Sequence, residues 1–454
     1  MKLRLMPLLT FCYLLQFLDK QSLSYATLLG LIEDTNLQGN EYSWVASVFY
    51  FGYLLWEGPT SYLMVRFPLG KYLSWSVLIW GTVLMFHGAC NSFTGLMITR
   101  FFLGVAEASV APGFSLMMGI FYKRSEQPFR HGLWFCGNSL AHFVGSILGF
   151  IIGNTNAGIA PWRLLFIIFG AITVFWAVIM LLLLPDSPSD AKFLSARDKQ
   201  VAIARVAENN TGIRSHQFKP EQVMEALRDP NVWLLTLYNF CINLPNGGLT
   251  SFGSLVIKGF GYGRLRSLLL QMPSGFIQLG IVILVTILPS KIRNIRTLLM
   301  FVAVMISNLG IAIVYFVDPA YKHVRLAGYY LCVSYGAQFP LGLSLVSSNV
   351  GGFTKKATVT GLMFVSYCVG NIVGPQFYFP SEAPRYTTGI ASALTGFSVS
   401  CLLLIVLRIH LIRENKRRDR AINADTVDVE VEEGLDSRIS DLTDWQRPSF
   451  RYVY

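Results

Sequence analysis

The sequence predicts an all-α membrane protein in which twelve transmembrane helices form two bundles of six. Only 14% of the 454 residues are charged, and 53% are hydrophobic, whereas a soluble domain carries about 25% charged residues. The apolar residues gather in runs long enough to cross a bilayer, and one polar stretch divides these runs into two sets of six. Together these observations indicate that lipid, rather than water, is the main solvent of the folded chain.

Twelve runs of mostly apolar residues define the predicted spans, because a helix needs about 20 such residues to cross the hydrocarbon core. The runs are 5–32, 42–65, 71–91, 94–120, 131–153, 164–185, 231–257, 267–289, 295–317, 326–349, 356–378 and 389–412. We therefore predict four parts: an N-terminal six-helix bundle, a cytoplasmic linker, a C-terminal six-helix bundle and a disordered cytoplasmic tail. In that order they cover 1–185, 186–230, 231–412 and 413–454.

Lysine and arginine in the short loops predict the orientation, because these residues are enriched on the cytoplasmic side. With the N-terminus inside, the inner loops and the start of the tail hold seventeen of them. The outer loops hold seven: Arg163, Lys258, Arg264, Arg266, Lys322, Arg325 and Arg385. Both termini and the linker are thus expected in the cytoplasm.

The linker itself has signals of local helix. Ser195 and Asp198 have the spacing of a capping box, and Pro220 suits the first turn of a helix. The tail begins basic and turns acidic from Asp425 onward, with few apolar residues. This composition favours disorder.

Four of the charged residues inside predicted spans stand out: Asp19 and Lys20 in the first, Arg100 and Glu107 in the fourth. Each would cost about 2.5–3.5 kcal/mol at the centre of a helix facing lipid. They must therefore face a wet cavity or one another. Arg100 and Glu107 share a helix face, two turns apart, and Gly104 between them leaves room for another helix or a ligand. The alternative to a role in transport is a set of buried salt bridges that fixes the bundle.

Polar residues in other spans are candidates for a cavity. Asn138 and His142 project from nearly the same side of 131–153, although His142 is best interpreted as a packing residue. Asn239, Asn243 and Asn246 form one stripe on 231–257, beside Pro245, which is expected to interrupt the helix and free backbone carbonyls. The stripe either lines a cavity or forms hydrogen bonds that hold neighbouring helices together. Single polar residues elsewhere are Gln271, Gln278, Gln338 and Asn371.

Several functions are excluded by what the chain lacks. It has no GxxxxGK[ST] loop for nucleotide phosphates, and no HExxH or GxSxG motif. None of the seven cysteines is spaced as CxxC, so we expect no metal site and no cofactor. The net charge of +11 forms no continuous basic stripe, which argues against nucleic acid as a partner. Transport would draw its energy from a gradient.

Several segments together carry a resemblance to a known family. They are FLDKQSLSYA (17–26), RFFLGVAEASVAPGF (100–114), PWRLLFIIFG (161–170), LPDSPSDAKFL (184–194) and NVGGFTKKATVTGLMFVSYCVGNIVGPQFY (349–378), followed by AP-Y-TTG (383–389). In these blocks the chain resembles the major facilitator superfamily, and within it the anion:cation symporters of the allantoate permease branch. Two features depart from the pattern. Val65 stands where the wider superfamily often has Asp, and relatives usually have a longer arm before the first span.

The resemblance implies two six-helix bundles around a central cavity that opens alternately to each side. It also implies that small carboxylates, such as allantoate, ureido acids or vitamin acids, enter with protons. Asp19 and Glu107 match acidic positions tied to proton coupling, and Lys20 and Arg100 match basic positions that meet the substrate carboxylate. We add Asn138, Asn239, Asn243 and Asn371 as candidate substrate contacts. A monomer in the plasma membrane is expected.

Two other functions fit the same fold. A facilitative carrier of a neutral solute would use the buried charges only for structure. A nutrient sensor would keep the fold and signal without net transport.

Overall fold

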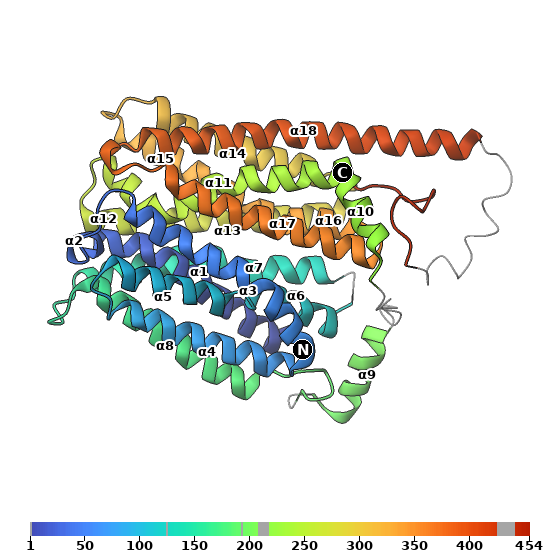
Figure 1. Cartoon of the computed structure of the whole chain (residues 1–454), viewed down its shortest axis with the longest axis horizontal. Helices are drawn as coiled ribbons and strands as arrows, with labels where there is room; N and C mark the ends of the chain where they lie inside the picture. Colours follow the sequence, from blue (N-terminus) through green and yellow to red (C-terminus); the bar gives the residue numbers. More distant parts are fainter. Residues whose placement is uncertain (1, 124–125, 192–193, 208–217, 425–440) are drawn as a thin grey trace.

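The computed structural model describes residues 2–123, 126–191, 194–207, 218–424 and 441–454 (Figure 1). The described chain is helical, because its long apolar runs satisfy their backbone hydrogen bonds internally. The helices of the first half are α1 (Lys2–Leu28), α2 (Leu31–Asp34), α3 (Glu41–Arg66), α4 (Leu69–His87), α5 (Phe93–Glu107), α6 (Val110–Phe121), α7 (Gln127–Gly153) and α8 (Pro161–Leu183). Those of the linker are α9 (Ala196–Ala207) and α10 (Pro220–Arg228).

The second half begins with the long helix α11. Its helices are α11 (Pro230–Gly259), α12 (Arg264–Leu269), α13 (Met272–Lys291), α14 (Arg296–Phe316), α15 (Lys322–Cys332), η1 (Val333–Ala337), α16 (Gln338–Asn349), α17 (Phe353–Val373), η2 (Gly374–Phe377), η3 (Pro380–Glu382) and α18 (Thr387–Ala424).

The helices pack as two neighbouring groups. In the first, α1 lies against α7, α3 against α5, and α4 against α8; in the second, α11 lies against α17 and α18, and α14 against α15 and α18. The groups meet where α7 packs on α13, α1 on α11, and α3 on α17. Figure 1 shows the helices running roughly parallel, with α10 at one end of the second group. We call this the linker end and the opposite one the far end.

Eight helical stretches of the described chain are long and apolar enough to cross a membrane. They are α4, α5 with α6, α7, α8, α12 with α13, α14, α17 with η2, and α18. The helices α1, α3 and α11 have 27, 26 and 30 residues and fall outside this set because they are more polar. In α1, nearly every side chain from Cys12 to Leu28 is buried in protein, so this part of the helix exposes little surface to lipid and need not be apolar. The count of twelve crossings remains a prediction.

One expectation about α11 is wrong. Pro245 does not interrupt the helix, which continues unbroken from Pro230 to Gly259. A proline ring normally collides with the preceding turn and removes a hydrogen bond. Here the neighbouring helix α18 leaves space for the proline ring, because Gly396 has no side chain. A Cβ at that position would lie 2.9 Å from Cδ of Pro245.

The local predictions for the linker are confirmed. The Ser195 hydroxyl accepts a hydrogen bond from the backbone N–H of Asp198 at 3.2 Å and donates one to its carboxylate at 2.7 Å, which starts α9. The second linker helix, α10, begins at Pro220.

The tail differs from the prediction of disorder over 413–454. The last span continues as helix α18 to Ala424, and residues 441–454 pack against the linker end of the second group. Low hydrophobicity predicts disorder only when a segment lacks partners. Here buried polar partners hold it, as described below. Residues 425–440 lie outside the described chain.

Hydrogen bonds join the two groups in the half nearer the far end. Ser24 donates to Ser254 at 2.9 Å, Tyr42 donates to the carbonyl of Ser251 at 2.6 Å, and Arg264 donates to the carbonyl of Leu28 at 3.1 Å. Nearer the linker end the contacts are aromatic: the rings of Phe135 and Phe339 stack with centroids 5.0 Å apart, and those of Tyr53 and Phe364 at 5.3 Å. The groups are thus closed against each other at the far end by polar contacts.

Candidate functional site

The four intramembrane charges meet inside the first helical group. Asp19 and Lys20 lie in the second half of α1, and Arg100 and Glu107 lie on the buried face of α5 together with Gly104. That face packs on α3 so closely that a Cβ at Gly104 would lie 2.0 Å from the carbonyl oxygen of Phe49. The predicted close approach of another helix at Gly104 is therefore confirmed, and α3 is that helix.

Lys20 is the centre of this cluster. Its ammonium lies 3.7 Å from Oε2 of Glu107, and 5.4 Å and 5.3 Å from the ring centroids of Phe49 and Tyr53. An ammonium near aromatic faces is stabilised by the ring quadrupoles. Glu107 is fully buried, and among the described residues its one ion pair is with Lys20. The sequence did not single out the two aromatic rings, because their spacing in α3 is that of ordinary packing residues.

Asp19 is held by a residue from a different helix. The indole Nε1 of Trp80 in α4 donates a hydrogen bond to Oδ2 of Asp19 at 2.5 Å, while Oδ1 has no hydrogen-bond partner among the described residues. Both side chains are fully buried. Trp80 was missed by sequence reasoning, because it stands in an apolar run with no polar pattern around it.

Arg100 has hydrogen-bonding capacity that the protein leaves unused. Its side chain is 2% exposed, yet Nε and Nη2 have no hydrogen-bond partner within the described chain. The guanidinium carbon lies 5.9 Å from the ring centroid of Phe166. A buried guanidinium normally satisfies its fork of donors with a carboxylate or phosphate. Two donor nitrogens of Arg100 could therefore bond to an anion.

The amides of the second group are brought together, but they bond to one another. Asn239 donates to the carbonyl of Met363 in α17 at 2.6 Å, and Asn243 donates to the carbonyl of Asn239 at 2.7 Å. Asn371 donates to Oδ1 of Asn243 at 3.3 Å and accepts from Asn246 at 2.8 Å. In this conformation the amide stripe joins α11 to α17.

Asn138 and His142 both lie on α7, but within the described chain they have no hydrogen-bond partner in common. Asn138 is buried, and its Oδ1 has no hydrogen-bond partner among the described residues. His142 is 2.6 Å from the Gln21 amide nitrogen, in agreement with a packing role that ties α7 to α1. Gln21 and His142 line a cavity of about 20 Å³, together with residues of the second group that include Gln271, Gln278 and Tyr335. That volume holds about one water molecule.

The chain is similar to known membrane transporters over nearly all of its length. The sequence profile of the Major Facilitator Superfamily matches residues 9–375. An uncharacterized transporter of Schizosaccharomyces pombe is 36% identical, over 99% of this chain and 85% of that protein. The allantoate permease of Saccharomyces cerevisiae is also 36% identical, over 98% of this chain and 84% of its own.

Solved structures agree on the fold. The xylose transporter XylE from E. coli, in a partially occluded inward-open conformation, aligns with a TM-score of 0.63. The alignment covers 87% of this chain and 95% of that structure at 12% sequence identity. At so low an identity the likeness concerns the arrangement of the helices alone.

Proposed function

Because the chain belongs to the major facilitator superfamily, a family of membrane carriers rather than enzymes, we propose that it imports a small organic anion together with protons. The substrate class is a small carboxylate, such as allantoate, a ureido acid or a vitamin acid. Alternating access of the two helical groups would move it across the membrane. The similarity to the allantoate permease supports the carboxylate class.

The observation that carries the proposal is the unused hydrogen-bonding capacity of Arg100, two turns of α5 away from the Lys20–Glu107 pair. A buried cation compensates for the hydration that an anion loses on entering the protein. Arg100 supplies two free donor nitrogens, which suits the two oxygens of a carboxylate. In our proposal Arg100 and Lys20 together bind the substrate.

Proton coupling follows from competition for Lys20. The Glu107 carboxylate is the anion nearest to the ammonium, at 3.7 Å, and a substrate carboxylate would need the same cation. A proton on Glu107 would remove its charge and release Lys20 to the substrate. Binding of proton and substrate would then support each other, as linkage requires. Asp19 is the second proposed proton site.

The amides complete the proposed substrate site. Asn138 offers an unbonded buried oxygen, which could accept from an N–H of a ureido or amide group. Asn239, Asn243 and Asn371 would contact the substrate only after exchanging their bonds between α11 and α17. Such an exchange would couple substrate binding to movement of those two helices.

An uptake assay tests the proposed function. Purified protein in liposomes should accumulate a radiolabelled small carboxylate when the outside is more acidic, and a protonophore should abolish the accumulation. Accumulation of a neutral analogue that ignores the protonophore would instead indicate a facilitative carrier. No flux of any carboxylate in a broad panel, with binding retained, would indicate a sensor.

The proposed location is the plasma membrane, with both termini and the linker in the cytoplasm, as the loop charges indicate. An epitope inserted near Asn209, which lies outside the described residues, should bind antibody only after cells are permeabilised. The matched control is the same epitope beside Asp318, in the far-end loop between α14 and α15, which should be reached in intact cells. The opposite pattern would reverse the orientation.

A further inference from the structure

The C-terminal segment, Asp441–Tyr454, is docked on the linker end of the second helical group. Asn349, at the end of α16, exchanges two hydrogen bonds of 2.8 Å with the backbone of Val453. Asn415 of α18 does the same with the backbone of Tyr452, at 2.8 and 2.9 Å. Paired amide contacts of this kind fix the segment in one register. Docking is thus a specific interaction rather than a loose collapse of the chain end.

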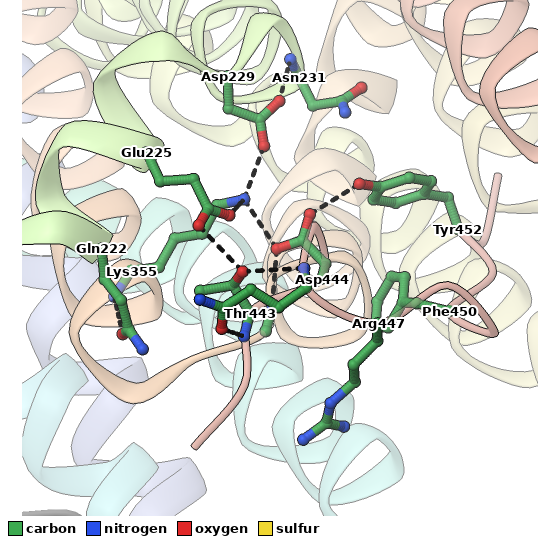
Figure 2. Close-up of polar contacts among 12 residues, drawn as sticks. Gln222, Glu225, Asp229, Asn231, Lys355, Thr443, Asp444, Arg447, Phe450 and Tyr452 are labelled. Carbon is green, nitrogen blue, oxygen red and sulfur yellow. Dashed lines mark hydrogen bonds and ion pairs between the residues drawn. The ribbon is translucent and has the colours of Figure 1, made fainter. Parts of the chain in front are cut away.

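Lys355, at the start of α17, binds the C-terminal segment to the helices (Figure 2). Its ammonium donates to Glu225 at 2.9 Å, Asp229 at 2.9 Å and Asp444 at 2.8 Å. These carboxylates come from α10, from the residue before α11, and from the C-terminal segment. Lys355 is fully buried, with Trp445 over it at 5.0 Å. One lysine therefore joins the linker, the membrane helix and the chain end.

The remaining contacts place hydrogen-bond donors against the carboxylate of Asp444. The backbone N–H of Gly351 donates to Oδ1 at 3.1 Å, and the phenol of Tyr452 donates to Oδ2 at 2.7 Å. Burial, and next the Asp444 charge, raise the pKa of Tyr452, so this phenol remains a donor. Asp441 similarly accepts from the N–H of Phe353 at 2.6 Å, at the positive end of the α17 dipole.

Thr443 lies between these groups and is fully buried. Its hydroxyl donates to Oε2 of Glu225 at 3.0 Å, and Figure 2 shows it beside Asp444 and below Lys355. Thr443 therefore contacts a carboxylate, and the Lys355 ammonium already faces three carboxylates. A phosphate adds a charge of about −1.5 to −2 and carries only acceptors. The docked segment could not keep such a group next to Glu225.

We propose that the docked C-terminal segment is a regulatory strap, which a phosphate on Thr443 releases from Lys355 and α10. The hydroxyl oxygen would attack the γ-phosphorus of a nucleoside triphosphate bound to a kinase. The new O–P bond replaces the bond to the nucleoside diphosphate, and the hydroxyl proton passes to the kinase's base. Because Thr443 is buried when docked, only the undocked state is modified, and the modification then holds that state. The site rests on the cytoplasmic orientation proposed above.

Hydrogen exchange measured by mass spectrometry on the full-length protein tests this directly. Thr443→Ser keeps the hydroxyl, and phosphoserine can be installed at the same position by stop-codon suppression. The amides of residues 441–454 should exchange slowly in the Ser variant, and at least about tenfold faster when that serine is phosphorylated. Equal protection in the two proteins would overturn the proposal. Peptides from α14 provide an internal check that the fold is intact.

Two further variants separate the phosphate from other effects. Gln446→Glu adds a negative charge three residues away at an exposed position, and it keeps the oxygen that accepts from the N–H of Thr443 at 3.0 Å; protection should be unchanged. Thr443→Val removes the hydroxyl without adding charge and should lose less protection than phosphorylation does. Release as large in either variant as with phosphate would refute a phosphate-specific site. The measurement involves no transport, so its result is independent of which solute the protein carries.

Discussion

Arg100→Met is expected to abolish substrate binding while leaving the protein folded. The change keeps an unbranched, though shorter, side chain and removes the donors that the protein itself leaves unbonded. A desolvated carboxylate that loses such a partner loses about 2–4 kcal/mol, which corresponds to a rise in Kd of about 30- to 1,000-fold. Binding of a radiolabelled carboxylate to the purified variant, by scintillation proximity, measures the effect.

Arg66→Met is the matched control, because Arg66 is exposed in α3 and, within the described chain, its guanidinium donates only to the hydroxyl of Tyr62. This variant should bind substrate normally. Size-exclusion chromatography should show a single folded species for both variants. If Arg100→Met bound substrate like the wild type, Arg100 would be a structural residue, and Lys20 would be left as the only candidate cation in the cluster.

Glu107→Gln is expected to separate exchange from accumulation. Gln has the shape of a protonated Glu and carries no charge, so Lys20 would remain available to the substrate at every pH. Exchange of labelled for unlabelled substrate across a liposome membrane should continue. Accumulation driven by a pH gradient should instead fall to a ratio of inside to outside concentration of about one, because a proton site that cannot titrate no longer couples to the substrate site. Parallel exchange and gradient-driven uptake assays measure the two activities.

The control is Glu33→Gln in α2, whose side chain is exposed and lies outside the cluster. It should retain both activities. Glu107 is not the coupling group if its Gln variant still concentrates substrate as the wild type does. Asp19, held by Trp80 at 2.5 Å, would then be the remaining candidate for the proton.

Much of the fold was predictable, because lipid imposes a simple rule on sequence. Long apolar runs with few charges must be helices in a bilayer, and Asp19, Arg100 and Glu107, charged residues inside such runs, lead to the cluster around Lys20. The spacing of Arg100, Gly104 and Glu107 also predicted their shared face, since helical periodicity is a local property. What holds along one helix can be inferred from that helix alone.

Contacts between distant segments were not predictable in this way. Nothing in the run around Trp80 indicates that its indole bonds to Asp19, 61 residues away. The docking of the C-terminal segment was missed because its acidic residues indicate solvation until their partner Lys355, 89 residues from Asp444, is known. Pro245 was misjudged for the same reason, since the glycine that accommodates its ring is on another helix.

The far-end contact between the two helical groups has a consequence for the surroundings in which the protein operates. Among the described residues the hydrogen bonds of that contact join hydroxyl, amide and backbone partners, with Arg264 bonding a neutral carbonyl, and no ion pair crosses it. Dissolved salt weakens attraction between charges, over a screening length of about 8 Å at physiological ionic strength, but it hardly affects short neutral hydrogen bonds. Separation of the two groups at this end should therefore need the same energy in dilute and in saline media.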